Sequence, residues 1–222
     1  MEYCDGVIGL YDFRGDVIRS MESAGFVYHS EVVIWKDPVT AMQRTKAIGL
    51  LYKQLRKDSA LSRQGVADYL VTFRKRDANE VPITKVAPPT GTTYSHARNV
   101  PANEFPVSRW QQYASPVWMD INPSDTLQRE SARAEDDERH ICPLQIEVIQ
   151  RGIELWSNPG EVVFSPFAGI GSEGYVALKQ DRKFIGCELK ESYWLQACQN
   201  LAMAESEARP MDLFTDSPER AA

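Results

Sequence analysis

One short stretch combines a strand pattern with glycines at a spacing that suits the binding of a nucleoside. Val162-Val163-Phe164 is typical of a short buried strand, and the loop that follows carries Gly169 and Gly171. Glycine lets a backbone turn tightly and approach a ligand without side-chain obstruction. The free N–H groups of the helix that begins there would face the ligand. Glu188, at the end of the next predicted strand, would accept hydrogen bonds from both hydroxyls of a ribose. The sequence therefore predicts a site for a nucleoside-containing cofactor.

Two other interpretations of this loop stay open. Residues 169–174 also satisfy the pattern G-x-G-x-x-G, and Glu188 lies 19 residues beyond the first glycine, as in a dinucleotide-binding fold. Only some thirty residues follow Glu188, fewer than the second half of such a fold needs. Glu173 would also place an acid close to any pyrophosphate on that helix. A glycine turn with a purely structural role is the remaining alternative.

Helix and strand patterns alternate around the loop. Apolar residues at helical spacing predict a helix from Pro143 to Trp156, with Pro143 in its first turn. A helix over 172–180, a second strand over 184–187 and a closing helix over 191–205 follow. This alternation predicts an α/β fold in which helices cover a parallel sheet.

The composition is that of an ordinary globular protein. Of 222 residues, 43% are apolar and 25% are charged, enough to bury a core without disulfide or metal staples. No apolar run reaches the roughly 18 residues of a membrane span, and the acidic start of the chain is no signal peptide. The four cysteines form no C-x-x-C pair, so we expect a reducing cytoplasm.

The net charge of −6 hides an asymmetry along the chain. Residues 36–76 contain ten basic and three acidic side chains, a net charge of +7, whereas acid is concentrated in residues 135–138 and after Ala204. Such a separation indicates a polyanionic partner for the basic segment. A solvated helix face is the alternative interpretation.

The first half of the chain carries weaker patterns. They predict a helix capped by Asp16 and ended by Gly25, a strand over 26–35, a helix through residues 48–55 and a strand over 69–73. From 77 to 139 the pattern fades among recurring prolines, and Trp110, Tyr113 and Trp118 favour an ordered loop region over a linker.

Several motifs occur together in one order and spacing. They are residues 140–145 (HICPLQ), 158–163 (NPGEVV), 165–172 (SPFAGIGS) and 185–189 (IGCEL), followed by Tyr193 and Ala197. The set strongly resembles the C-terminal half of the DNA amino-methyltransferases, the N-4 cytosine/N-6 adenine methylase family. The resemblance is greatest to the versions carried by bacteriophages and prophages.

The resemblance implies a Rossmann-like S-adenosylmethionine-dependent methyltransferase sheet in permuted order, with the cofactor motif last and an irregular target-recognition insertion. We expect a remnant of the catalytic half at 1–36 and a basic and target-recognition region at 37–139. The cofactor-binding half would occupy 140–206 and an acidic, disordered tail 207–222.

The cofactor implied by the resemblance is S-adenosylmethionine. Glu188 would hold its ribose, and the remaining pocket residues are His140, Pro143, Leu144, Ser165, Pro166, Phe167, Gly169, Gly171 and Ser172. Ser165 stands where the family usually has aspartate, which weakens one polar contact near the cofactor. No metal is expected: His140-x-Cys142 is too small a set for a zinc site.

A catalytic Pro-Pro-aromatic loop, which the family uses to hold the flipped base, is not found. Only fifteen residues precede Asp16, so we expect the chain to lack the first strands of the catalytic half. Ser115, Pro116 and Trp118 are the nearest in composition and are weak candidates for a base clamp. An exposed strand edge would then favour a homodimer.

The resemblance thus implies site-specific transfer of a methyl group to the N6 of adenine or the N4 of cytosine in duplex DNA. It also implies a location in the cytoplasm of a bacterial host. Lys46, Lys53, Arg56 and Lys57 would bind DNA phosphates. The rival interpretation is a catalytically incomplete remnant or accessory subunit that binds DNA, cofactor or both.

Overall fold

The structure is a computed structural model that describes residues 11–77, 81–83, 107–127 and 143–208, together with two short strands at 2–4 and 7–9. The chain divides into two compact units, Met1–Ile121 and Asn122–Ala222, which we describe separately. Most of the expected recognition region between 77 and 139, the acidic run at 135–138 and the tail from 209 lie outside the described residues. The domain boundaries expected from the sequence stay predictions.

Helix α1 (Phe13–Ser23) opens the well-described part of the first unit. Its N-cap is Asp12, whose side chain accepts a 3.0 Å hydrogen bond from the backbone N–H of Gly15. The predicted cap at Asp16 is therefore wrong: Asp16 lies in the first turn, where its carboxylate pairs with Arg19. The predicted stop is confirmed, because Gly25 follows the helix with a φ of +94°.

A three-stranded sheet in the order β4-β3-β5 forms the body of this unit. Strand β3 (Val27–Ile34) pairs antiparallel with β4 (Asp68–Arg74) and parallel with β5 (Val117–Trp118). Helix α1 packs on β3 and β4, where Arg14 pairs with Glu31 and lies 5.1 Å from the centre of the Tyr69 ring. Strands β1 (Glu2–Cys4) and β2 (Val7–Gly9) form a separate antiparallel pair.

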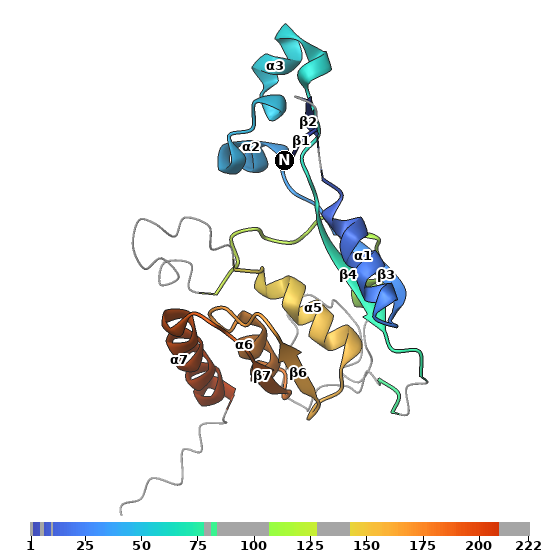
Figure 1. Ribbon diagram of the computed structural model, residues 1–222. Helices are drawn as coiled ribbons and strands as arrows, with labels where there is room; N and C mark the ends of the chain where they lie inside the picture. Colours follow the sequence, from blue (N-terminus) through green and yellow to red (C-terminus); the bar gives the residue numbers. More distant parts are fainter. Residues whose placement is uncertain are drawn as a thin grey trace, which may run out of the picture. The chain divides into compact units, whose positions relative to one another are not determined.

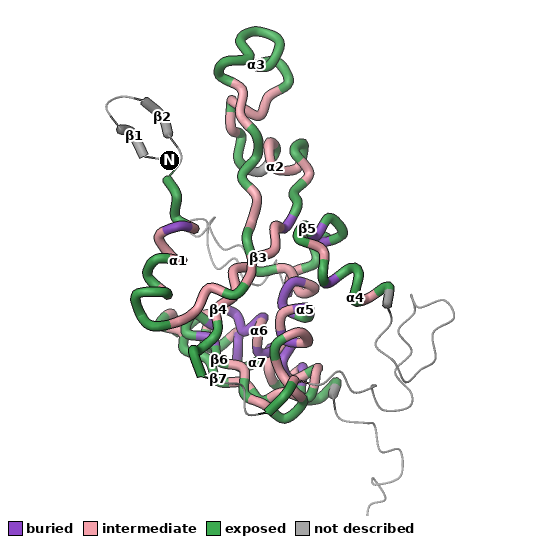
Figure 2. Tube along the Cα trace, turned by 90° about the vertical axis from the view of Figure 1, so that its right-hand side faces the viewer, coloured by how far each residue is buried: buried purple, intermediate pink, exposed green. Residues whose placement is uncertain are grey.

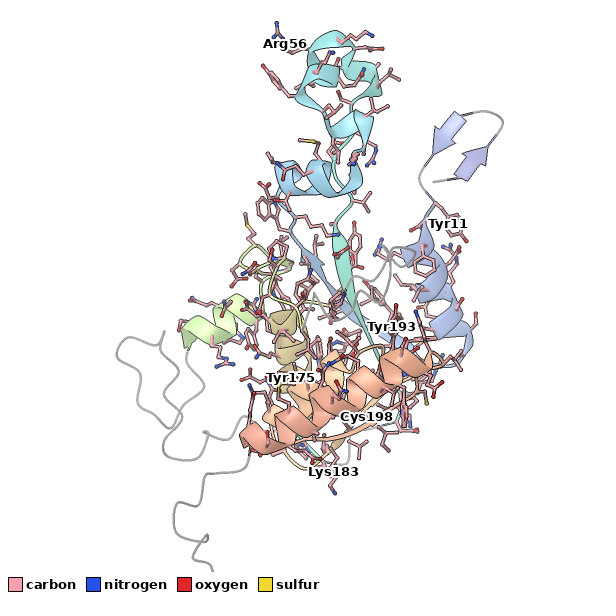
Figure 3. The ribbon with its side chains drawn as sticks, turned by 90° about the vertical axis from the view of Figure 1, so that its left-hand side faces the viewer. Tyr11, Arg56, Tyr175, Lys183, Tyr193 and Cys198 are labelled. Carbon is pink, nitrogen blue, oxygen red and sulfur yellow. The ribbon has the colours of Figure 1, made fainter. Side chains whose placement is uncertain are left out.

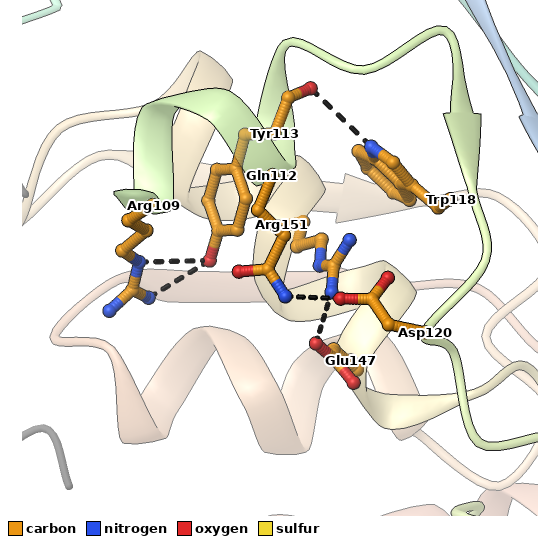
Figure 4. A network of polar contacts seen from close by, with 7 residues as sticks. All are labelled: Arg109, Gln112, Tyr113, Trp118, Asp120, Glu147 and Arg151. Atoms are coloured by element: carbon orange, nitrogen blue, oxygen red, sulfur yellow. Dashed lines mark hydrogen bonds and ion pairs between the residues drawn. The ribbon is translucent and has the colours of Figure 1, made fainter. Parts of the chain in front are cut away.

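Aromatic residues around β5 pack into the core of the first unit. Trp118 is 1% exposed, and its indole N–H donates to the carbonyl of Tyr113, at the end of α4 (Val107–Tyr113). Arg109 donates to the Tyr113 hydroxyl at 2.9 Å, as Figure 4 shows. Trp110 is exposed, whereas the rings of Tyr113 and Trp118 lie 6.4 Å apart within the core.

Residues 35–67 connect β3 to β4 and form a segment that we call the arm. It contains α2 (Pro38–Thr45), the 3-10 turns η1 (Ile48–Leu50) and η2 (Ser59–Leu61), and α3 (Tyr52–Lys57) (Figure 1). The predicted helix through 48–55 is interrupted, because Leu51 is extended (ψ 131°) after its N–H closes a 3-10 turn on Ile48. None of the arm residues whose burial is described is buried, as Figure 2 shows.

The second unit has the predicted alternation of helices and parallel strands. Its elements are α5 (Ile146–Trp156), β6 (Val162–Ser165), α6 (Ser172–Lys179), β7 (Lys183–Gly186) and α7 (Glu191–Ala208). Strands β6 and β7 are parallel, with register Val162↔Lys183 to Ser165↔Gly186. Pro143 precedes α5 rather than lying in its first turn. The reason is that Gln145 is extended and forms a bridge with Thr126.

Helix α6 is the centre of this unit, since it contacts α5, α7 and both strands. Val176 and Ala177 of α6 are buried with Ile149 and Ile153 of α5, and Phe184 of β7 packs against them. The strand predicted to be fully buried is covered on one face: Val162 and Phe164, with Ile185 of β7, are each more than half exposed. On α5 the buried Arg151 pairs with Glu147 (Figure 4).

Candidate functional site

The carboxyl ends of β6 and β7 lie side by side, so the loops that leave them meet. The strand pairing ends at Ser165 and Gly186. Beyond it, the N–H of Cys187 donates to the carbonyl of Ser165 at 2.9 Å, and the N–H of Ala168 donates to the carbonyl of Cys187 at 2.8 Å. Residues 166–171, the glycine loop, are thereby fastened to the segment after β7.

Glu188 closes this junction with its side chain. One carboxylate oxygen (Oε2) accepts the N–H of Gly169 at 2.8 Å, and the other (Oε1) accepts the N–H of Lys190 at 2.9 Å. A carboxylate oxygen has two lone pairs, so each oxygen keeps capacity for a second donor. The half-buried carboxylate is therefore held in one orientation and can still accept two hydroxyl groups from a ligand.

The two glycines of the loop have different surroundings. Both have a positive φ, +53° at Gly169 and +82° at Gly171. A Cβ at Gly169 would meet nothing within 4 Å, whereas one at Gly171 would lie 3.1 Å from the Cβ and 3.3 Å from the Cα of Ala197. Gly171 thus permits close packing against α7, and Gly169 faces open space.

Asn200 of α7 supports the glycine loop through a hydrogen bond. The sequence patterns did not identify this residue. Its fully buried side chain donates a 2.8 Å hydrogen bond to the carbonyl of Ile170, and Gln196 donates to its Oδ1. Ala197, Asn200 and Ala204 are all buried and follow one another at helical spacing. The sequence does contain a signal that could have identified Asn200, namely a polar residue on an otherwise apolar face of the predicted closing helix.

The remaining predicted pocket residues of the loop divide into buried and exposed groups. Ser165 and Ser172 are buried, and Pro166 is exposed. The ring of Phe167 is 86% exposed, and Leu189 on the other side of the junction is fully exposed. Two large apolar side chains next to a polar carboxylate give the junction the mixed character of a small-molecule site.

The segment before α5 is described only in part. His140 lies outside the described residues, Pro143 is half-buried and Leu144 is exposed. Ile146, two residues further on, packs against Ile170 of the glycine loop together with Leu127. The start of α5 therefore approaches the loop.

Glu173 is a half-buried carboxyl group in the first turn of α6. Burial raises its pKa above the usual value, and a hydrogen bond from its own backbone N–H opposes that rise. Ionising Glu173 therefore costs folding free energy at neutral pH.

The candidate base clamp lies at β5 of the first unit. The Ser115 hydroxyl donates to the carbonyl of Val117 at 2.8 Å, and the carbonyl of Pro116 accepts the N–H of Val33. Trp118 is buried as described above. In this arrangement all three residues make their contacts within the first unit.

The four predicted phosphate-binding residues all lie in the arm. Lys46 is the left-handed C-cap of α2 (φ 51°), and Lys53, Arg56 and Lys57 project from α3. The three α3 side chains and Tyr52 line a shallow hollow of about 350 Å³. Figure 3 shows Arg56 at the far end of the arm.

Metal-binding clusters and membrane-spanning helices are both absent from the part of the chain that the structure describes. No group of three or more His, Cys, Asp or Glu side chains there could hold a metal ion. Nor is any described helix long and apolar enough to cross a membrane. The His140-x-Cys142 pair lies outside the described residues.

Comparison with protein families gives one match that spans most of the chain. The model described as "DNA methylase" (N6_N4_Mtase) matches residues 11–199. The match includes all of α1 at one end and the first half of α7 at the other.

Individual relatives are similar over shorter segments. Type II methyltransferase M1.MboII of Moraxella bovis is 41% identical over 58 residues, which are 26% of this chain and 22% of the relative. DNA adenine methyltransferase YhdJ of Escherichia coli K12 is 37% identical over 67 residues, 30% of this chain and 23% of the relative. The matched segments thus span less than a quarter of these curated relatives.

A solved structure shares the fold. TTHA0409 of Thermus thermophilus, described as a DNA modification methylase and crystallised with S-adenosyl-L-methionine, superposes with a TM-score of 0.58 at 16% identity. The superposition covers 88% of this chain and 61% of that one. The predicted Rossmann-like α/β fold is thereby confirmed.

Replacing Asn200 tests its contribution to stability. Asn200→Leu leaves the carbonyl of the buried Ile170 without its donor, so the free energy of unfolding in urea should fall by about 1–3 kcal/mol. Gln199→Leu, another exchange of an amide for leucine but at an exposed position of α7, should change it by less than about 0.5 kcal/mol. Equal effects of the two substitutions would contradict a supporting role.

Glu173→Gln tests the buried carboxyl group. Because the pKa is raised in the folded state, the stability that protonated Glu173 contributes is complete below the usual pKa of 4.5 and is lost as the pH rises through the folded value. The variant should therefore unfold at a higher temperature than the parent at pH 7, with the difference shrinking toward pH 4. Glu205→Gln controls for the loss of one exposed acid. A difference that grows toward pH 4 would refute the assignment.

Proposed function

The chain belongs to the DNA methylase family, and we propose that it binds S-adenosylmethionine at the glycine loop and takes part in methylating an exocyclic amine in DNA. The single observation that supports this proposal most is the junction of Glu188 with Gly169 at the carboxyl ends of two parallel strands. Ligands of open α/β sheets bind in this position.

The residues at the junction fit an adenosine-containing cofactor. The two Glu188 oxygens retain acceptor capacity for the ribose hydroxyls. The exposed Phe167 ring offers an apolar face to a purine, and the open space in front of Gly169 allows the ligand to approach the backbone. The floor of the cofactor site would be formed by Ser165, Pro166, Gly171 and Ser172, and a further wall by His140, Pro143 and Leu144.

When bound, S-adenosylmethionine would supply an electrophilic methyl group carried on its sulfonium. The chain's own contribution is to hold the ribose with Glu188 and to keep the loop backbone fixed through Asn200. The acceptor is the N6 of adenine or the N4 of cytosine. Ser115, Pro116 and Trp118 stay weak candidates for contact with the base.

Duplex DNA would bind to the arm. Lys46, Lys53, Arg56 and Lys57 would contact phosphates and position the duplex without reading its sequence. We further propose a cytoplasmic location in a bacterial host and a place in restriction-modification. Homodimer formation and a phage or prophage origin stay predictions from the sequence.

Matched glycine substitutions test the cofactor site. Gly169→Ala adds a methyl group to open space and costs only about 1–2 kcal/mol of backbone strain, but it should weaken S-adenosylmethionine binding tenfold or more. Gly171→Ala should mainly lower stability, because its Cβ would crowd the backbone of Ala197. Calorimetric titration and urea unfolding separate the two effects. Unchanged affinity in Gly169→Ala would refute the site.

Transfer of labelled methyl from S-adenosylmethionine to unmodified duplex DNA tests the activity, with Gly169→Ala as the control. Transfer by the parent that falls in the variant supports an enzyme. Cofactor binding without any transfer would favour the rival function of an incomplete or accessory chain.

The salt dependence of binding tests the DNA surface. The logarithm of the association constant should fall linearly with the logarithm of salt concentration, and removing Lys53 and Arg56 together should reduce the slope by about 1.8. Lys183→Ala, which removes one exposed cation from β7 of the second unit, should leave the slope unchanged. A slope insensitive to the arm substitutions would contradict the assignment.

A further inference from the structure

The arm exposes apolar side chains that its own fold leaves uncovered. Ile48, Tyr52 and Leu55 are 69%, 73% and 54% exposed, and Leu61 is 65% exposed. The arm is held instead by contacts between its own residues, such as the hydrogen bond from the N–H of Arg63 to the carbonyl of Gly49 at 3.0 Å. Exposed apolar groups gathered within one element and bordered by charge mark a surface for a partner.

Cations accompany these apolar groups on α3. Tyr52 and Arg56 are four residues apart, as are Lys53 and Lys57, so each pair lies along one side of the helix. All four line the shallow, open hollow, and none of the described residues that line it is acidic. Tyr52 therefore stands directly beside three cations on an open surface that a large partner can reach.

The charge of the arm selects the partner. Residues 35–67 contain seven basic and two acidic side chains, a net charge of +5 in a chain of net charge −6. A polyanion matches this surface, and duplex DNA also presents sugars and the edges of its bases between the phosphates, against which a tyrosine can pack. An anionic lipid surface supplies both charge and an apolar layer, but the DNA methylase family of the chain favours the nucleic acid.

We propose that Tyr52 makes a non-electrostatic contact with a sugar or base of duplex DNA while Lys53, Arg56 and Lys57 bind the flanking phosphates. The inference rests on the proposed function, because it assumes that DNA is the substrate. It adds to that function a contact on the DNA that charge neutralisation does not supply. With this contact, the arm would bind a groove of the DNA duplex as well as its phosphates.

Anisotropy titrations of a labelled duplex at several salt concentrations separate the two kinds of contact. Tyr52→Ala should weaken binding by roughly tenfold at every salt concentration and leave the slope against salt unchanged, as expected for loss of an apolar contact. Lys57→Ala should instead reduce the slope by about 0.9. Phe13→Ala, which removes an exposed aromatic ring from α1, should have no effect.

The outcomes distinguish this inference from the proposed function. If the parent binds DNA and Tyr52→Ala binds equally well, or changes only the slope, the Tyr52 contact is overturned while the proposed function stands. Absence of DNA binding by the folded parent would overturn both. Binding of the arm to phosphatidylserine vesicles in preference to duplex DNA would also overturn the inference, in favour of a membrane surface. Because Tyr52 is exposed, far-UV circular dichroism should show unchanged folding of the variant.

Discussion

The hydrogen bond between the Gly169 N–H and the Glu188 carboxylate is the contact on which the candidate site depends. It joins two loops that leave neighbouring parallel strands, and it brings a strand-end carboxylate to the glycine backbone. A charged acceptor makes this one of the stronger hydrogen bonds in the unit. Without it, only the Lys190 N–H would hold the carboxylate, and the glycine loop would lose its link to the end of β7.

The packing behind the loop serves the same geometry. Helix α6 is buried against α5 and both strands, so its first turn has a fixed position relative to the strand ends. Helix α7 adds Asn200 on the Ile170 carbonyl and Ala197 against Gly171. The far end of the same helix pair is held by Lys179 of α6, which donates to Glu207 of α7 at 2.9 Å and contacts the ring of Tyr175, labelled in Figure 3. The loop can therefore be rigid although glycine makes its backbone permissive.

The arm follows a different principle. It has local helical order and capping, as at Asp37, whose side chain accepts the N–H of Thr40, but none of its described residues is buried. Elements with few buried contacts have low local stability and commonly gain order from a partner. An arm of this kind extends from the hairpin of β3 and β4. Its surface, which carries cations and exposed apolar side chains, can therefore adapt its shape to a long polymer.

How much the sequence predicted differs between the two units. The loop, its two glycines, Glu188 and the alternation of strands and helices from 143 to 205 followed from residue types and spacing, because each is a requirement of the local backbone. The one-sided exposure of β6, the break at Leu51 and the cap at Asp12 did not follow. They depend on which neighbours cover a strand or reach an N–H, and several arrangements suit the same local pattern.

By itself, then, the sequence determined the order of the elements, the positions where only glycine suits the backbone, the charge of the arm and the family. Only the tertiary structure decided that Asn200 supports the loop, that Glu188 accepts a hydrogen bond from the loop, and that Tyr52 stands uncovered beside three cations. The physical reason is the separation along the sequence of the residues that determine each property. Periodicity and φ are properties of a few consecutive residues, whereas burial and hydrogen-bond partners are fixed by segments far apart in the sequence, 30 residues between Asn200 and Ile170 and more between Val33 and Pro116.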